Sequence, residues 1–243
     1  CQLMTEGKEI YNLNEENLVN ARPDLIISQD ICEVCSAHTD HVKRAMGILE
    51  KKPDVYTMNP HDIDEILKSI EEISKKIGRE KEGASLVDSL RKRVGFVKDK
   101  TFEKMPRVTA IEWIDPFFTS GHWVPEMIEI AGGRNLISSE KMPSRKMHLD
   151  EIKDADPDII VIMPCGFDVK RTVDEYNKTL AENKEWSDLR AVKENSVYAV
   201  DANSYFSKPS LRTVTGIEIL ASIFHPEIFK GLKIPENSYM KIN

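Results

Sequence analysis

The sequence lacks the features that define several large classes of protein. No apolar run approaches the roughly 20 residues of a membrane-spanning helix, and no signal-peptide pattern opens the chain. The net charge is −7 and the lysine pairs lie among acidic residues, which argues against a nucleic-acid surface. Four cysteines in 243 residues are too few for a disulfide scaffold. The remaining composition, 40% hydrophobic and 31% charged, is that of an ordinary globular chain.

Recognisable catalytic motifs are also absent. The chain has no G-x-S-x-G elbow, no P-loop and no G-x-G-x-x-G after an apolar run. Asp30 and Glu33 form the only close carboxylate pair at the end of a predicted strand, and both are as readily explained as solvated residues. We therefore expect a protein that is not an enzyme.

One motif occurs twice. Residues 16–27 and 150–161 each combine an acidic helix start, a short amphipathic helix, Pro-Asp and an apolar run. The residue before a proline is disfavoured in the α region, so Pro23 and Pro157 end their helices. The apolar run that follows suits a strand buried on both faces. A second similarity, between 52–58 and 195–200, extends the repeat. The pattern predicts an α/β fold of two lobes with similar parallel-sheet topology and a ligand cleft between them.

The periodicity predicts the main elements and the lobe boundaries. A helix is expected to start at Asn59-Pro60, and a second from Arg79 to about Phe102, burying Leu86, Leu90 and Val94. This second helix is heavily charged elsewhere, which suits a single link between lobes. We expect an amino-terminal lobe over 1–78, a linking helix over 79–103 and a carboxy-terminal lobe over 104–243. Strands are expected at 24–28, 55–58, 107–114, 158–163 and 197–201.

Three cysteines follow the repeated strands. Cys32 and Cys35 come after the first copy and Cys165 after the second, at positions where open parallel sheets bind ligands. The three thiols are candidates for a metal site, for a ligand-contacting set or for a redox pair. They are equally compatible with small buried residues at helix starts.

Other candidate ligand contacts follow strand ends. Gly166 permits close backbone approach and Phe167 gives a flat wall, although a plain strand-to-helix turn explains both. Arg212 is expected in the first turn of a helix starting near Pro209, where it opposes the helix dipole. Ala131-Gly132-Gly133 is expected to be only a helix C-cap. The remaining candidates are side chains that hydrogen-bond or stack: His122, Trp123, Tyr205 and Phe206.

An ordered series of motifs resembles one family over nearly the whole chain. The segments are 22–27, 111–123, 131–136, 156–161 and 205–210, which read RPDLII, IEWIDPFFTSGHW, AGGRNL, DPDIIV and YFSKPS. They resemble the substrate-binding proteins of ABC transporters of the helix-linked type, which bind cobalamin, ferric siderophores or haem, with the cobalamin branch nearest. The family's amino-terminal lobe normally opens with a further strand, helix and strand, which this chain does not show.

The resemblance implies the function. It predicts capture of cobalamin or a related metal chelate, a membrane permease as partner, no required cofactor and an extracytoplasmic, membrane-associated location. A cytoplasmic location stays open because no signal segment is present. Cys1 is compatible with a lipidated terminus, or with an arbitrary start of the chain. The alternative function is a metal-binding or thiol-redox protein that uses Cys32, Cys35 and Cys165.

Overall fold

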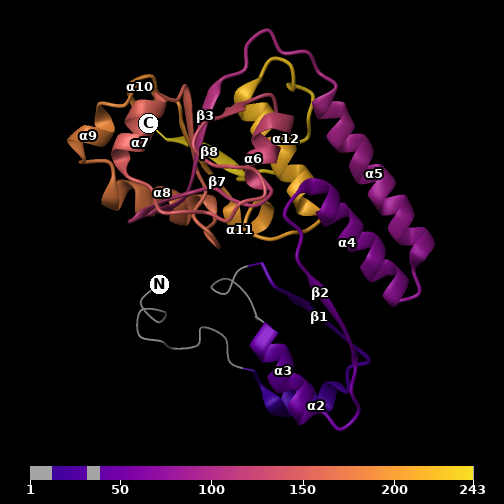
Figure 1. Cartoon of the computed structure of the whole chain (residues 1–243). Coiled ribbons are helices and arrows are strands. Elements are labelled where there is room, and N and C mark those ends of the chain that lie inside the picture. The colour runs from indigo at the N-terminus through magenta and orange to yellow at the C-terminus, as the bar shows by residue number, and fades with distance from the viewer. Residues whose placement is uncertain (1–12, 32–38, 243) are drawn as a thin grey trace. The chain divides into compact units, whose positions relative to one another are not determined.

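The computed structural model of the chain describes residues 13–31 and 39–242. The chain divides into two compact units, residues 1–60 and 61–243. Both units are built from parallel strands and helices (Figure 1). Each unit is described by itself below.

The first unit contains a parallel pair of strands, with Leu25 opposite Asp54. Helix α2 begins after Asn14, whose side chain accepts the Asn17 N–H at 2.8 Å, as preferred N-caps do. Helix α2 ends at Arg22, which adopts the left-handed conformation. The elements of this unit are α2 (Glu15–Ala21), β1 (Leu25–Gln29), α3 (Thr39–Ile48) and β2 (Asp54–Met58).

The second unit is built on a mixed sheet in the order β4-β3-β6-β7-β8, with β5 also beside β3. Strands β3, β5, β6 and β7 are parallel, whereas β4 and β8 run antiparallel to their neighbours. The strands are β3 (Arg107–Ile114), β4 (Phe117–Thr119), β5 (Arg134–Asn135), β6 (Ile159–Ile162), β7 (Val197–Val200) and β8 (Tyr239–Ile242).

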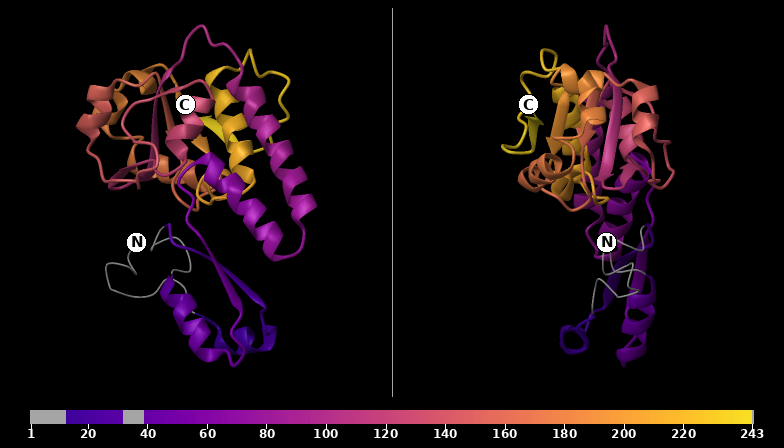
Figure 2. Two further views of the ribbon diagram at one scale, coloured as in Figure 1. Left: turned by 45° about the vertical axis from the view of Figure 1, so that its right-hand side comes forward. Right: turned by 90° about the vertical axis from the view of Figure 1, so that its left-hand side faces the viewer.

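Helices cover both faces of this sheet (Figures 1 and 2). Helices α7 to α10 pack on one face, while α6 and α12 cover the other and α5 and α4 follow outside them. The helices are α4 (Ile63–Lys76), α5 (Glu80–Lys98), α6 (Val124–Ile130), α7 (Leu149–Ala155), α8 (Val169–Thr179), α9 (Lys184–Ser187), α10 (Arg190–Lys193), α11 (Ala202–Tyr205) and α12 (Arg212–Phe224).

The core of the second unit follows from strand alternation. Successive side chains of a strand point to opposite faces, so Ile160 and Ile162 pack with Trp186 on one face while Val161 points to the other. All four side chains are fully buried. The continuous apolar runs of the sequence are therefore explained by a sheet that is covered on both sides.

The repeated motif produces the same local structure in both units. Helix α2 ends at Arg22 (φ 44°, ψ 55°) and helix α7 ends at Asp156 (φ 41°, ψ 63°). In each case the left-handed residue stands before a proline, and a parallel strand starts two residues after that proline. The prediction that Pro-Asp ends the helix and opens a strand is confirmed.

The five predicted strands are present, but two helix starts are wrong. Helix α4 begins at Ile63 rather than at Asn59-Pro60, because Asp62 caps it by accepting the Glu65 N–H at 2.7 Å. Helix α12 begins at Arg212 rather than at Pro209, since a turn held by Ser210 comes first. Arg212 does lie in the first turn, as predicted.

The stripe predicted for the charged helix is partly wrong. Leu86 is 38% exposed, and the buried face of α5 is formed by Val87, Leu90 and Val97. Leu86 lies one helical turn before Leu90, at the edge of this face, and stays partly exposed there. Helices α4 and α5 fall in the second compact unit, which begins at residue 61. The lobe boundaries at 78 and 103, and the bridging role of the helix, stay predictions.

Candidate functional site

The loops after β3, β6 and β7 leave the same edge of the second unit's sheet, which is where parallel sheets bind ligands. Hydrogen bonds connect them. The Gly166 N–H donates to Ser207 Oγ at 3.1 Å, and the Asn203 N–H donates to the Phe167 carbonyl at 3.0 Å. The Cys165 N–H donates to the Glu112 carbonyl at 3.2 Å. This edge is therefore held as a single cross-linked surface.

Three side chains form a wall at this edge, which we call the aromatic wall: Trp113, Phe167 and Arg171. The Trp113 ring meets Phe167 edge-on at 5.4 Å, and the Arg171 guanidinium lies 3.7 Å from the centre of the Phe167 ring. Trp113 is half-buried and its indole N–H donates to the Asp115 carbonyl at 3.1 Å. Arg171 is exposed. Toward solvent the wall therefore offers part of the Trp113 indole and the Arg171 guanidinium, which Phe167 supports from beneath.

Gly166 lies beside the aromatic wall and is exposed. Its φ of +77° is favoured only by glycine, and a Cβ built there meets nothing within 4 Å. The predicted close approach of a ligand to this backbone is thus sterically open. Phe167, the next residue, is 6% exposed because Trp113 and Arg171 cover it.

Trp123 and Phe206 are joined to each other and buried. The Trp123 indole N–H donates to the Phe206 carbonyl at 3.0 Å, and the two side chains are 4% and 3% exposed. This pair supports the loop after β7 from inside. Tyr205 is half-buried and Arg212 is exposed. Ligand contact by any of these four residues stays a prediction.

His122 follows strand β4 rather than β3 directly. Strand β4 turns back antiparallel to β3, so the Ser120 N–H bonds to the Ala110 carbonyl in mid-strand at 3.2 Å. His122 instead lies next to His61, with ring centres 5.8 Å apart. Burial, and then the neighbouring His61, lower the pKa of His122. Ligand contact by His122 stays a prediction.

A half-buried carboxyl group lies in the same region of the second unit. Glu126 accepts the Ile63 N–H at 2.8 Å, which connects helix α6 to the start of α4. Burial raises the pKa of Glu126, and the surrounding carboxylates of Asp62, Asp64 and Glu140 add to this effect. Lys141 pairs with Asp62 at 2.8 Å.

Of the three cysteines predicted to form a site, only Cys165 lies among the described residues. Cys165 is a half-buried cysteine at the carboxyl end of β6. Cys32 and Cys35 lie outside the described residues. Within residues 13–31 and 39–242, no group of three or more His, Cys, Asp or Glu side chains is arranged to hold a metal ion. The predicted metal site at Cys32, Cys35 and Cys165 gains no support from the described residues.

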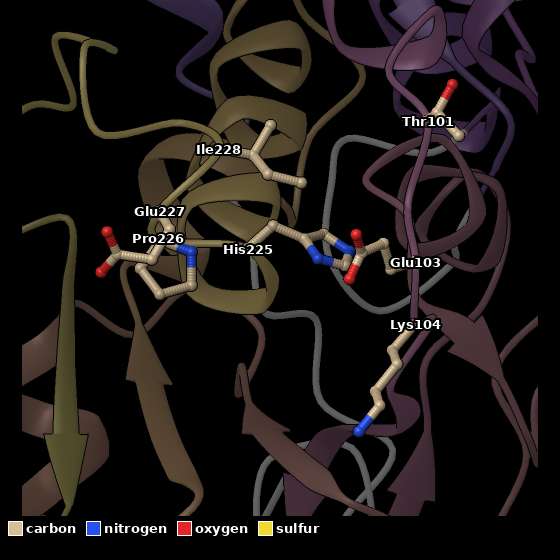
Figure 3. A pocket seen from close by; sticks show the side chains of 7 residues that line it. All are labelled: Thr101, Glu103, Lys104, His225, Pro226, Glu227 and Ile228. Carbon is tan, nitrogen blue, oxygen red and sulfur yellow. The ribbon is translucent and has the colours of Figure 1, made fainter.

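A hollow of about 430 Å³ lies at the opposite end of the sheet (Figure 3). It is open and lies between the segment before β3 and the segment after α12. His225 stacks on Phe102 at 4.2 Å and bonds to the Gly132 carbonyl at 2.9 Å, so its ring is already engaged. The hollow is lined by Thr101, Glu103, Lys104, His225, Pro226, Glu227 and Ile228.

Sequence reasoning missed two residues of the aromatic wall. Trp113 alternates within a strand, a pattern that is typical of a half-buried core position, and it is half-buried. Arg171 was not considered. Its signal is the spacing to Asp168, which caps helix α8 by accepting the Arg171 N–H at 2.8 Å and so places Arg171 in the first turn after Phe167.

Comparison with known proteins assigns the family. The model of the periplasmic binding protein family matches residues 5–204. The chain therefore belongs to the periplasmic binding protein family, whose helix-linked type the motif series resembles. Solved structures of ABC-transporter substrate-binding proteins share its fold, as the α/β two-lobe prediction requires.

Two curated relatives within that family are similar to this chain in sequence. A curated relative, the uncharacterized ABC transporter substrate-binding lipoprotein YvrC of Bacillus subtilis, is 26% identical over 228 residues, 90% of this chain and 67% of that protein. The haem uptake protein IsdE of Staphylococcus aureus is 25% identical over 141 residues, 55% of this chain and 47% of that protein. The chain thus spans about half to two thirds of these relatives.

Two solved structures show how close the fold is. The structure of S. aureus IsdE complexed with haem superposes with a TM-score of 0.72 at 19% identity, covering 88% of this chain and 81% of the other. The haem-binding protein RhuT from Roseiflexus sp. RS-1 gives a TM-score of 0.70 at 18% identity, covering 88% of this chain and 80% of the other.

No helix among the described residues combines the length and apolarity needed to cross a bilayer.

Proposed function

We infer that this chain is the substrate-binding component of an ABC import system and that it captures a planar metal chelate, such as haem, at the aromatic wall. The wall of Trp113, Phe167 and Arg171 beside the open Gly166 is the observation that carries the proposal. The haem-binding names of IsdE and RhuT support the same ligand class. Cobalamin and ferric siderophores are the other metal chelates that the motif series implies, and the siderophores are not planar.

The chemistry of the wall fits such a ligand. Covering the flat face of a macrocycle gains roughly 25 cal/mol per Å² of apolar area, and aromatic rings supply that surface. Arg171 adds a planar donor that suits a carboxylate on the ligand edge. Because hydrogen bonds already join the loops after β6 and β7, little ordering entropy is lost on binding.

The rest of the system follows from the family. The partner would be a membrane permease that receives the chelate unchanged, with no nucleic acid involved. The location would be extracytoplasmic and membrane-associated, for which the lipoprotein name of YvrC is the support. The metal-binding or thiol-redox alternative stays a prediction without support, because Cys32 and Cys35 lie outside the described residues.

A panel titration tests the ligand class. Haem, a ferric siderophore and cyanocobalamin are titrated into the chain and followed by tryptophan quenching. Because Trp113 is itself a reporter, binding to its variants is measured by equilibrium dialysis of the coloured ligand. We expect saturable one-to-one binding of haem. Binding of none of the three ligands would contradict the proposal, and cobalamin alone would correct its ligand.

Substitutions in the wall locate the site. Trp113→Ala should weaken haem binding by about 1–3 kcal/mol, by analogy with aromatic anchors at interfaces. Arg171→Gln should weaken the binding of haem more than it weakens the binding of a ligand that has no carboxylates. Lys178→Gln, an exposed cation near the far end of α8, is the matched control and should bind as the parent does. Equal affinity of Trp113→Ala, Arg171→Gln and the parent would place the ligand elsewhere.

The buried pair requires a separate comparison. Trp123→Ala and Phe206→Ala are also expected to weaken binding by ~1–3 kcal/mol if these rings reach the ligand. Since both are buried, their loss also lowers the stability of the loop after β7. A variant that loses stability but binds haem normally would show that the pair only supports the site.

A further inference from the structure

Two histidines outside the aromatic wall meet in the second unit. His61 precedes helix α4 and His122 precedes helix α6, so they come from loops far apart in the sequence. Their ring centres are 5.8 Å apart and their planes are inclined by 34°. Neither residue was expected beside the other from the sequence, because the return of β4 is what brings His122 to this position.

Both rings carry an unsatisfied buried nitrogen. The Nδ1 atoms of His61 and His122 are inaccessible to solvent and have no hydrogen-bond partner among the described residues. A buried polar atom without a partner lowers stability, so native proteins rarely keep two together. An imidazole nitrogen that finds neither water nor a donor is available as a lone pair to a cation.

The backbone fixes both rings firmly. The His61 N–H donates to Glu65 Oε2 at 2.7 Å. His122 adopts a left-handed conformation (φ 54°), which non-glycine residues seldom hold without a reason. That conformation is secured by hydrogen bonds at 2.7 Å from the His122 N–H to the Met142 carbonyl and at 3.0 Å from the Lys141 N–H to the His122 carbonyl. The two imidazoles are therefore positioned before any ligand arrives.

The surrounding charges favour a cation. The carboxylates of Asp62, Asp64, Glu65, Glu126 and Glu140 are gathered near the loops that carry the two rings, against one ammonium group at Lys141. Asp62 is paired with Lys141, Glu65 accepts the His61 N–H and Glu126 accepts the Ile63 N–H. These carboxylates supply negative potential, and three of them, Asp62, Glu65 and Glu126, also keep a structural partner.

From this geometry we propose that His61 and His122 form a two-imidazole site for a borderline divalent cation of the Zn²⁺, Ni²⁺ or Co²⁺ class. With metal–nitrogen bonds of about 2.0–2.1 Å, two imidazoles on one ion place their ring centres roughly 5–6 Å apart, which matches the observed separation. Imidazole nitrogen suits these ions. Among the described residues no third side chain is arranged with these two, so the protein supplies two ligands to the ion. Bound metal would connect the starts of α4 and α6 within the second unit.

Metal titration of the EDTA-treated chain tests the site. We expect calorimetry to show one Ni²⁺ per chain, and Co²⁺ to give a visible spectrum with nitrogen ligation. His61→Gln and His122→Gln should each weaken Ni²⁺ binding by about tenfold or more, and the double variant should abolish it. His148→Gln, which removes an exposed histidine, is the matched control and should bind as the parent does.

A stability measurement makes the outcome independent of ligand capture. Ni²⁺ should raise the thermal midpoint of the parent and of His148→Gln, because it binds only the folded state, and should not raise it in the double variant. No chelate is present in this experiment, so its failure leaves the proposed function untouched. Absence of binding in the parent, or undiminished Ni²⁺ binding and stabilisation in a folded double variant, would overturn the site.

Discussion

The two copies of the repeated motif differ in what surrounds them rather than in their own conformation. In both, a short helix ends in a left-handed residue before a proline and a parallel strand follows. In the first unit the strand has only one buried residue, Ser28, and helix α2 has none. In the second unit Ile160, Val161 and Ile162 are 0% exposed. The motif therefore specifies a local turn, and packing is decided elsewhere.

The ion pairs just before β1 and β6 also differ between the two units, being isolated in the first and shared in the second. In the first unit Asp24 pairs with Lys51 at 2.7 Å, and both side chains are more than 80% exposed. In the second unit Arg190 bonds to both Asp156 and Asp158, and Arg107 also reaches Asp156. Isolated exposed pairs contribute little stability, whereas shared networks contribute more. The comparison predicts that matched substitutions will have unequal effects.

The largest expected difference in unfolding free energy is between matched substitutions in β6 and β1. Ile160→Ala should cost about 2–5 kcal/mol of unfolding free energy because it opens a cavity in a closed core. The equivalent Ile26→Ala, at a half-buried position, should cost under about 1 kcal/mol. Tryptophan fluorescence in urea follows the second unit, since Trp113, Trp123 and Trp186 all lie there. Amide exchange of β1 and β2 follows the first. Equal losses would refute the contrast.

A second test asks whether α5 is energetically part of the second unit. Arg93 on α5 bonds to Glu218 on α12 through Nε at 2.8 Å and Nη2 at 2.5 Å, and Glu218 is 8% exposed. Arg93→Met leaves that carboxylate unpaired and should cost about 2 kcal/mol, allowing for partial exposure of the arginine. The tryptophan-monitored transition should move.

The control for that test is a double variant. Arg93→Met combined with Glu218→Leu removes both charges and should recover part of the lost stability. An unmoved transition in Arg93→Met would mean that α5 is held mainly by Val87, Leu90 and Val97.

The ion pairs just before β1 and β6 are expected to have a smaller effect on stability. Arg190→Met should cost about 1 kcal/mol, after discounting its exposure, because it breaks contacts with two aspartates and with the Asp156 carbonyl. Lys51→Met should leave the stability of the first unit unchanged within error. Amide exchange and urea denaturation provide the two readouts. A larger effect at Lys51 than at Arg190 would reverse the comparison.

The smallest expected effect is a dependence on pH. Hydrogen bonding from Arg190, the largest cause, lowers the pKa of Asp156. A lowered folded-state pKa contributes stability that is complete above the unfolded value of about 3.9 and is lost as pH falls through the folded value. As the pH is lowered below about 4, the urea concentration at the unfolding midpoint of the second unit should therefore decrease. Arg190→Met should make this decrease with pH less steep. An unchanged slope would show that other carboxylates dominate.

Local signals predicted the strands well and the edges of the sheet badly. The Pro-Asp repeat located β1 and β6 because a short segment determines both the end of the helix and the start of the strand. Strand β8 was missed since Tyr239, Met240 and Lys241 are all exposed and form no apolar run. Strand β4 was missed because Asp115-Pro116 was interpreted as the end of a strand rather than a return.

Long-range packing explains the errors at the candidate site. Trp123 was expected to be open to a ligand, but its indole bonds to Phe206, which lies 83 residues away. No local pattern reports such a contact. Gly166 and Phe167 were located correctly at a strand end, since that position depends only on β6 and the turn that follows it. The covering of Phe167 by Arg171 depends on the cap of α8, which is local but was overlooked.

Strand β8 has a consequence for how the second unit is made. It pairs along the whole of β7, from Val197 opposite Ile242 to Val200 opposite Tyr239. Among the described residues it follows every other strand of this sheet in chain order, so a ribosome delivers it after them. Until then β7 presents an open edge that invites pairing with another chain. A nascent or shortened chain that ends before Tyr239 is thus the form in which this protein is most exposed to aggregation during synthesis.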